Sequence, residues 1–403
     1  MDFTFTPEQR LMASTFRRLA DDLGTPAQFR AGSEGRGGAA GMDGRGDAAG
    51  MQGRGDAAGV EGRGDAAGVE GRGDAAGAEG RGDAPAETWR RLVELGLAGM
   101  LAPESAGGLG LTETDFILVA EEAGRAALSE PLIEHAGIAV PMLADLAGAM
   151  LADTAGQALA AQVLPRAASG AARVAIGHPI DPYVLGGARA DYLLLASGDE
   201  VHLVEARHAR LTRVESIDRG RELVKVDLRA SQTTRIAAGT TAREACRCAL
   251  ERGALYSAAQ LVGLCQRMID LAVAYARERQ QFGKPIGSYQ AIQHALASVQ
   301  VKLEFARPVL YYAATRVCHP SLRAQAAVSH AKLAATDAAD LAARTALQVH
   351  GAMGYSWEVD LHVYMKRAWA LAGAWGDRSF HARRVSSLVL ESHIELGPER
   401  TFD

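Results

Sequence analysis

Apolar residues recur every three or four positions through one long stretch of the chain, which is the spacing of a single face of an α-helix. The members of this face are Leu255, Ala259, Val262, Cys265, Ile269, Val273 and Ala276. The pattern ends at Gly283-Lys284-Pro285, because glycine accepts left-handed dihedrals and proline has no N–H to donate to a further turn. A second helix is predicted to begin at Tyr289 or Gln290.

The corner between these two helices gathers side chains that are able to bind an anion. The pattern predicts that Arg279 and Gln281 lie in the last turn of the first helix, with Phe282 directly after it. A guanidinium at such a corner can bind a phosphate through two N–H groups. An arginine near a helix C-terminus also has a purely structural use, because its charge offsets the helix dipole and its N–H groups bind free carbonyls. The residues alone leave both interpretations open.

The first 150 residues are predicted to form a helical domain. Thr6 is a suitable N-cap, and Gln9 is placed to close a capping box with it. Further amphipathic helices are expected around Trp89, from Thr114 to Ala127 and from Pro131 to Ala149.

An insertion interrupts that domain at about 35–84, where the chain repeats the nine-residue unit G-R-G-D-A-A-G-x-x. Glycine and alanine with balanced charge bury too little apolar surface to offset chain entropy, so a disordered or loosely structured loop is favoured. One alternative is a calcium-binding β-roll, which has the same period but needs a large apolar residue where this repeat has small ones. The other is cell adhesion through Arg-Gly-Asp, for which the rest of the chain gives no context.

The spacing of apolar residues changes to that of β-strands between about 151 and 240. Five short apolar runs predict a small sandwich or barrel. The runs are Arg173–Ile176, Tyr192–Leu195, Val201–Val204, Leu211–Val214 and Leu223–Val226. From 241 to 403 the pattern is helical again and indicates a bundle. The expected fold class is therefore mainly α with a central β domain.

Composition limits the possible partners and the location. The 403 residues are 48% hydrophobic and 23% charged, and the formal net charge is -5, which gives no electrostatic reason to expect nucleic acid or a membrane as a partner. No apolar run reaches the length of a bilayer span, and the first residues lack the features of a secretory signal. The four cysteines show no zinc-binding spacing, so we expect no metal site and a reduced, cytoplasmic protein.

Three motifs in this order resemble signatures of the acyl-CoA dehydrogenase family. Residues 279–286, Arg-x-Gln-Phe-Gly-x-Pro-Ile, with Gln290 after them, are similar to its pyrophosphate- and adenosine-binding motif. Residues 348–355 resemble its Gln-x-x-Gly-Gly-x-Gly-Tyr turn, and residues 103–110 resemble a glycine loop between its early helices. The resemblance implies an N-terminal helical domain, a middle β-sandwich or barrel and a C-terminal four-helix bundle. It also implies FAD as the cofactor, contacted here by Arg279, Gln281, Phe282, Gln290, Gln348, Gly351 and Ala352.

The chain departs from the family where the flavin ring and the catalytic base belong. The family segments that approach the ring, Thr-Glu-Pro…Gly-Ser-Asp and Lys-x-x-Ile-x-Asn, are reduced or missing. The family's glutamate base most often lies about twenty-seven residues after the glutamine of the second signature, and the stretch 372–377 here holds no glutamate. The other base position in the family corresponds to Gly253, with Glu251 two residues away.

Asp377 and Glu251 are the two candidates that remain for a catalytic base. Asp377 also stands where an N-cap is expected for a helix that begins near Ser379. Glu251 is equally open to interpretation as a solvated charge beside Arg252. A shift of two residues on a helix turns a side chain by about 200°, away from the original direction.

These expectations give one hypothesis and two rivals. The chain keeps the half of the family's site that grips FAD across a subunit interface, so it resembles the non-catalytic subunit of heteromeric steroid-type acyl-CoA dehydrogenases. The rivals are a self-sufficient dehydrogenase or oxidase that uses Asp377 or Glu251, and a structural subunit without flavin contact. The expected partners are an acyl-CoA substrate, a homologous subunit in a dimer or tetramer, and an electron-transfer flavoprotein as electron acceptor.

Overall fold

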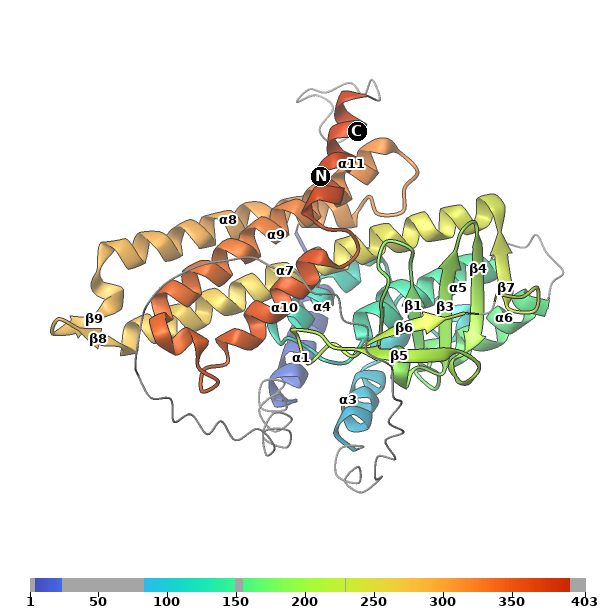
Figure 1. Cartoon of the computed structure of the whole chain (residues 1–403), viewed down its shortest axis with the longest axis horizontal. Coiled ribbons are helices and arrows are strands. Elements are labelled where there is room, and N and C mark those ends of the chain that lie inside the picture. The colour runs from blue at the N-terminus through green and yellow to red at the C-terminus, as the bar shows by residue number, and fades with distance from the viewer. Residues whose placement is uncertain (1–3, 24–82, 149–154, 229, 392–403) are drawn as a thin grey trace, which may run out of the picture.

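The computed structural model describes residues 4–23, 83–148, 155–228 and 230–391. Figure 1 shows three parts in chain order: N-terminal helices, a central pair of β-sheets and a long C-terminal helical bundle. The fold class expected from the sequence is confirmed, whereas the domain limits near 150 and 240 stay predictions. The nine-residue repeat lies outside the described residues apart from its end, where helix α3 begins. Within the described ranges no helix is both long and apolar enough to cross a bilayer.

The N-terminal part begins with the capping box that the sequence predicts. Gln9 donates its backbone N–H to Thr6 Oγ1 at 3.3 Å, and Thr6 donates its own to Gln9 Oε1 at 2.8 Å, so two N–H groups outside the helical ladder are satisfied. The stretch expected as one helix from Pro131 to Ala149 instead begins as a π-helix, η3, and continues as α5. The helices and single 3-10 turns of this part are α1 (Pro7–Asp22), α3 (Asp83–Glu94), η1 (Leu97–Gly99), η2 (Glu104–Ala106), α4 (Glu113–Arg125), η3 (Ile133–Ala139), α5 (Val140–Gly148) and α6 (Ala155–Ala168).

The two central sheets pack face to face as a small sandwich. The first has the strand order β1-β3-β4-β7, and the second has the order β2-β6-β5. Alternate side chains of β3 serve two cores, because Leu193 and Leu195 pack with Val184 and Val224 of the second sheet, whereas Leu194 joins the main core. All five predicted runs are strands. The strands are β1 (Val174–Gly177), β2 (Val184–Leu185), β3 (Tyr192–Ser197), β4 (Glu200–Glu205), β5 (Arg210–Val214), β6 (Leu223–Asp227) and β7 (Arg235–Ala238).

Helix α7 connects the N-terminal part to the C-terminal bundle. It is 40 residues long and packs against α4, α8, α9 and α10, which explains the buried apolar face that the sequence shows (Figure 1). A short hairpin separates it from α8, which begins at Gln290 as predicted. The elements of this part are α7 (Gly239–Glu278), β8 (Gln280–Gln281), β9 (Lys284–Pro285), η6 (Ile286–Ser288), α8 (Gln290–Ala314), α9 (Leu322–His350), η7 (Gly351–Tyr355), α10 (Leu361–Gly373) and α11 (Arg378–Leu390).

Candidate functional site

The corner residues lie in a β-hairpin that follows α7, not in the last turn of the helix. Arg279 is the C-cap of α7, with extended dihedrals, and Gln281 pairs with Lys284 across the hairpin. Phe282 and Gly283 both have positive φ, 55° and 80°, as a two-residue hairpin turn requires because that twist matches the twist of the strands. The prediction that Arg279 and Gln281 lie in the last helical turn was therefore wrong.

The hairpin presents charge and a bare aromatic ring to its surroundings. Phe282 is 93% exposed, and Arg279 and Gln281 are exposed as well. Arg279 has no acidic partner among the residues that the structure describes. The Lys284 ammonium lies 4.2 Å from the centroid of the Tyr289 ring, so two cations flank the turn. An unpaired guanidinium beside backbone turns is well suited to a phosphate.

The second motif lies at the same end of the bundle. The rings of Tyr275 on α7 and His350 on α9 stack with centroids 4.4 Å apart, which holds the C-terminal ends of the two helices together. Gly351 then ends α9 with φ 57° and ψ -135°, a conformation that side-chain-bearing residues rarely adopt. Gln348, Gly351 and Ala352 are exposed there. The fold therefore brings the two motifs to one end of the molecule.

Glu251 is a buried structural carboxylate. It is 0% exposed, so its interpretation as a solvated charge was wrong. Its Oε1 accepts from Arg247 at 2.7 Å and from Arg384 at 3.1 Å, and its Oε2 accepts from the backbone N–H of Cys318 at 3.0 Å. Both oxygens are thus engaged with donors from α7, α11 and the turn between α8 and α9. Removing a proton from a substrate carbon needs a carboxylate oxygen directed at that carbon, and this geometry directs neither oxygen at a cavity.

Asp377 is an N-cap. Its Oδ1 accepts from the backbone N–H of Phe380 at 2.7 Å at the start of α11, as the structural alternative for this residue predicts. The side chain is exposed. The two sequence candidates for a base are therefore brought into structural roles at different places, and they form no common site.

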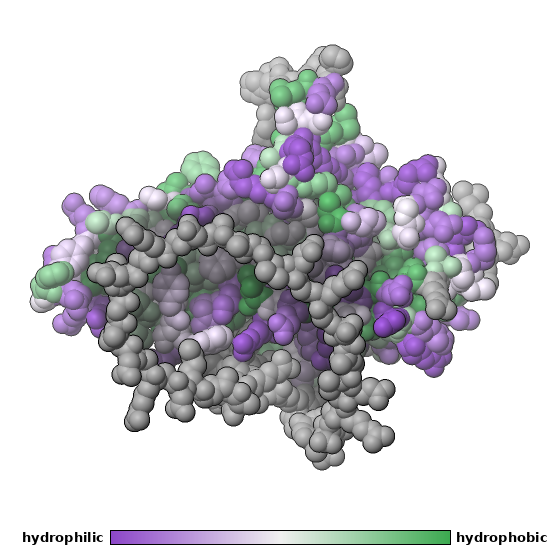
Figure 2. All heavy atoms as spheres, in the orientation of Figure 1, coloured by the Kyte–Doolittle hydropathy of each residue, from purple (hydrophilic) through white to green (hydrophobic). Residues whose placement is uncertain are grey.

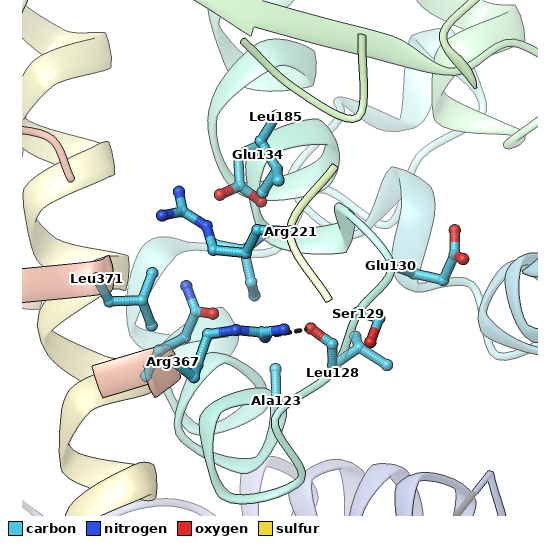
Figure 3. Close-up of a pocket in the computed structure, with 11 residues that line it drawn as sticks. Ala123, Leu128, Ser129, Glu130, Glu134, Leu185, Arg221, Arg367 and Leu371 are labelled. Atoms are coloured by element: carbon cyan, nitrogen blue, oxygen red, sulfur yellow. Dashed lines mark hydrogen bonds between the residues drawn. The ribbon is translucent and has the colours of Figure 1, made fainter. Parts of the chain in front are cut away.

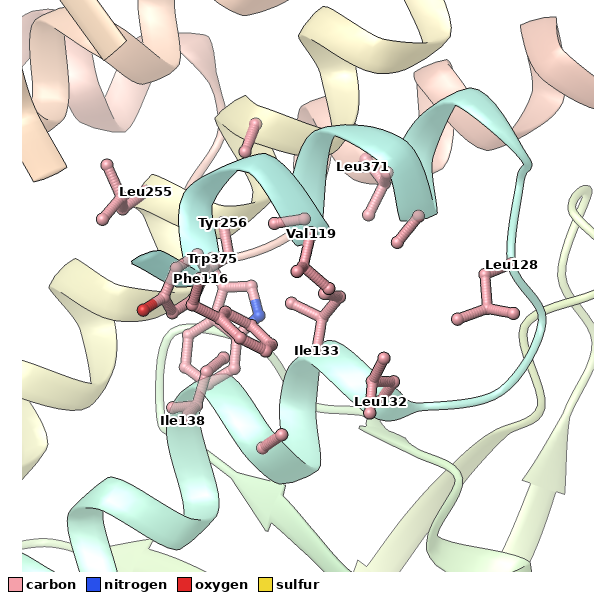
Figure 4. Packing of buried hydrophobic residues seen from close by; sticks show 14 of the residues in the cluster. Phe116, Val119, Leu128, Leu132, Ile133, Ile138, Leu255, Tyr256, Leu371 and Trp375 are labelled. Atoms are coloured by element: carbon pink, nitrogen blue, oxygen red, sulfur yellow. The ribbon is translucent and has the colours of Figure 1, made fainter. Parts of the chain in front are cut away.

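Trp375 belongs to no sequence motif, and it lies 27 residues after Gln348, where the resemblance to the family leads one to expect a glutamate base. The indole lies against Gly253 on α7, the other base position, so closely that a Cβ on residue 253 would be 2.1 Å from Trp375 Cδ2. Figure 4 shows the indole packed beside Phe116 of α4 and Ile138 of η3. Trp375 is buried and has a φ of 56°, an uncommon conformation for a bulky residue. The space between α4, η3 and α7 is thus filled by a tryptophan.

Ion pairs close the cleft between the β-sandwich and the bundle. Arg367 of α10 pairs with Asp218 of the loop between β5 and β6 and donates to the carbonyl of Leu128 at 2.6 Å (Figure 3). From the same loop, Arg221 donates to the carbonyl of Ala370 at 3.4 Å. The cavity left between these side chains has a volume of about 10 Å³, which is about the least that holds one water molecule. The space between these particular side chains is therefore no larger than a water site.

Burial controls the titration of the groups around this cleft. It raises the pKa of Glu134, although Arg221 and Arg367 oppose that shift. It lowers the pKa of Lys332 to about 7, and the charge of Arg221 adds to this effect. Lys332 donates to the carbonyl of Leu371 at 2.5 Å. Glu134 is thus accompanied by two arginines and Lys332 by a carbonyl, as buried polar groups require.

The chain matches two models of one protein family. Residues 70–171 match "Acyl-CoA dehydrogenase, N-terminal domain", and residues 242–387 match "Acyl-CoA dehydrogenase, C-terminal domain". Among curated proteins, acyl-CoA dehydrogenase IpdE2 of Mycobacterium tuberculosis is 34% identical over 308 residues, which cover 75% of this chain and 87% of the relative.

Two solved structures have the same fold over almost the whole chain. The ChsE4-ChsE5 complex from Mycobacterium tuberculosis gives a TM-score of 0.71 at 23% identity and covers 97% of this chain and 99% of that one. A glutaryl-coenzyme A dehydrogenase in complex with glutaryl-CoA gives a TM-score of 0.73 at 21% identity and covers 97% of each chain. The resemblance found in the sequence is confirmed, and so is FAD as the cofactor of the family. The individual FAD contacts stay predictions.

Proposed function

The chain belongs to the acyl-CoA dehydrogenase family, FAD-dependent enzymes that desaturate acyl-CoA thioesters, and we propose that its part in that reaction is to complete the FAD site of a catalytic partner subunit. The observation that carries this proposal is the contact between Trp375 and Gly253. Neither position of the family's base holds a carboxylate, and the indole fills the space that faces both. An acyl chain and a base therefore have no place between α4, η3 and α7 of this chain.

The hairpin corner fits the phosphate-bearing part of FAD. Arg279 offers a guanidinium with no acidic partner in the described part of the chain, and Gln281 and Phe282 are exposed beside it. Gln290, Gln348, Gly351 and Ala352 complete the set that would hold the cofactor. FAD bound there supplies the acceptor for the hydride that leaves the substrate. The contribution of this chain is to position the phosphates, since an arginine fork fixes both distance and orientation.

The side chains that line the cleft of this chain favour a flavin ring bound elsewhere. The segments beside and between the strands are those that approach the ring in the family, and here the loop that carries Asp218 and Arg221 is tied to α10 by Arg367. A cavity of about 10 Å³ remains. We therefore assign the ring, and with it the reacting carbon of the substrate, to the partner subunit.

The hairpin end of the molecule also has the surface that such a partner would cover. Phe282 at the turn is 93% exposed, and hydrophobic side chains are visible among hydrophilic ones at that end (Figure 2). Further along α8, Phe305 is 74% exposed. Aromatic residues are enriched in protein interfaces, which favours this face as the one that the partner covers. The partner proposed is a homologous acyl-CoA dehydrogenase subunit, in line with the two-component ChsE4-ChsE5 complex. We further propose a cytoplasmic location and an electron-transfer flavoprotein as acceptor.

The rival proposals make different demands on the structure. A self-sufficient enzyme would need Glu251 or Asp377 as its base, and the first is bound by two arginines while the second caps a helix. A purely structural subunit would leave the exposed Arg279 without a use. Neither rival accounts for the corner and for Trp375 together.

The experiment compares the purified chain with a copurified pair of this chain and the acyl-CoA dehydrogenase encoded beside it. Bound flavin is measured by absorbance, and its reduction is followed as bleaching on addition of an acyl-CoA. The proposal expects bleaching in the pair and none in the lone chain. Flavin that is bound and bleached by the lone chain overturns it, and a stable pair without flavin supports the structural rival.

A further inference from the structure

Two cysteines from distant parts of the sequence meet near the N-terminal end of α7. Cys248 lies on α7, and Cys318 lies in the turn between α8 and α9, 70 positions away. The Sγ of Cys248 is 3.9 Å from the carbonyl oxygen of Cys318, and the Sγ of Cys318 is 3.7 Å from the carbonyl oxygen of Cys248. Each thiol thus faces the backbone carbonyl of the other cysteine, which places the two side chains next to each other, and both cysteines are free.

The turn that carries Cys318 is clamped in place. The backbone N–H of Cys318 donates to Glu251 at 3.0 Å, and the carbonyl of Cys318 accepts from Arg247 Nη2 at 2.8 Å. Cys318 has a φ of 64°, in the left-handed region that residues other than glycine seldom adopt. The structural role of the Glu251 carboxylate is thus to hold this turn against α7.

The surroundings of the two sulfurs are cationic and differ between them. Arg247 Nη2 lies 3.5 Å from Cys248 Sγ. The pKa of Cys248 is lowered, first by the hydrogen bond from the Cys318 thiol and then by the charges of Arg247 and Arg252, against the effect of burial. The same hydrogen bond and burial raise the pKa of Cys318. Reactive cysteines occur in electropositive settings of this kind.

We propose that Cys248 and Cys318 form a redox-active dithiol that a hydroperoxide converts into a disulfide. Cys248 attacks the terminal oxygen of the hydroperoxide, the O–O bond breaks, and an alcohol or water leaves while Cys248 becomes a sulfenic acid. Cys318 then attacks that sulfur, the S–O bond breaks and water leaves. In sum, two thiols lose two electrons and two protons, and the hydroperoxide is reduced to one alcohol, or water, and one further water.

The site is independent of the FAD corner. Residues 248 and 279 are separated by about 45 Å along α7 at 1.5 Å per residue. The disulfide would join α7 to the turn between α8 and α9 and close a 70-residue segment of the bundle. The nearest other cysteine in sequence, Cys246, shares α7 but has neither a thiol neighbour nor an arginine N–H at its sulfur among the described residues, which makes it the matched control.

The test treats the reduced full-length chain with one equivalent of hydrogen peroxide and then counts free thiols and maps disulfides by mass spectrometry. We expect loss of two of the four thiols and a peptide that links residues 248 and 318. Cys246→Ser keeps the same link. Cys318→Ser gives a sulfenic acid at Cys248, trapped with dimedone, and Cys248→Ser leaves Cys318 a thiol. Retention of all four thiols, or a disulfide that involves Cys246, overturns the proposal.

Discussion

The indole of Trp375 and the α-carbon of Gly253 touch across the space between α7 and the loop before α11, so that a Cβ on residue 253 would stand 2.1 Å from Cδ2 of the ring. Real Cβ atoms do not approach so closely. The two positions to which the family resemblance assigns a base are thus joined into one packing contact. A glutamate at position 253 would have to displace the indole.

Because of that contact, a single methyl group added at Gly253 should lower the stability of the chain strongly. Gly253→Ala is expected to destabilise the chain by about 1–3 kcal/mol, because the indole must move within a packed core. The measurement is the free energy of unfolding in urea. Gly373→Ala on α10 is the control, since an added Cβ there meets nothing within 4 Å.

A double-mutant cycle makes this prediction specific to the pair. Trp375→Gly alone removes a buried aromatic side chain and should cost about 3–5 kcal/mol. In the Trp375→Gly background the cost of Gly253→Ala should vanish, because its obstacle is gone. Equal costs of Gly253→Ala in both backgrounds would contradict the contact.

The two sequence candidates for a base are expected to behave as structural residues. Glu251→Ala leaves Arg247 and Arg384 short of a buried acceptor and should destabilise the chain by about 3 kcal/mol. Asp377→Ala removes an N-cap and should cost about 1 kcal/mol, whereas Asp377→Asn should cost less because the amide oxygen still accepts.

Activity separates these structural effects from catalysis. In the copurified pair, Asp377→Asn and Glu251→Gln should each leave the rate of flavin bleaching by an acyl-CoA within about twofold of the unaltered pair, because the proposed function assigns the reacting carbon to the partner. A loss of a thousandfold or more with either variant in correctly folded protein would restore that residue as the base.

One buried glutamate should make a contribution to the stability of the chain that falls with rising pH. Burial raises the pKa of Glu121 on α4 from 4.5 to about 7, although a hydrogen bond from Tyr311 and the charge of Arg307 oppose this. A raised pKa in the folded state means that folding favours the protonated acid. The associated stability is present below pH 4.5 and is lost as the pH rises through 7.

Glu121→Gln isolates that contribution. The difference in unfolding free energy between Glu121→Gln and the unaltered chain should grow by about 3 kcal/mol between pH 4.5 and 7, in favour of the variant. Buried histidines such as His135, with a pKa of about 4, titrate in both proteins and cancel in the difference. A difference that is flat with pH would show that Glu121 does not titrate as its burial implies.

Local patterns predicted much of the fold. Thr6 and Gln9 predict a helix start, because both partners of the capping box lie within four residues of the sequence. The five strand runs are short, apolar and separated by turns, and all five are strands. The hairpin after α7 was not predicted, because phenylalanine has no preference for the left-handed dihedrals that Phe282 adopts. The two-residue turn imposes them.

Long-range partners account for the other differences. Glu251 is held by Arg384, 133 positions away, and no spacing rule relates the two. Trp375 packs on Gly253, which lies far from it in the sequence. This contact could not be predicted, because it depends on how α7 and the loop before α11 pack against each other in the fold. The group around Arg279 could be recognised from the sequence, because its residues are close together in the chain.

The most direct test of the account is the affinity of the copurified pair for FAD when Arg279 is replaced. Arg279→Ala in this chain should raise the Kd for FAD at least about tenfold, since hydrogen bonds to charged groups contribute about 1.5–3 kcal/mol and about 1.4 kcal/mol is a factor of ten. Arg277→Ala, two residues earlier on the same exposed end of α7, should leave the Kd unchanged. Equal FAD affinity in the two variants and the unaltered pair would contradict the claim that this chain grips the phosphates for its partner.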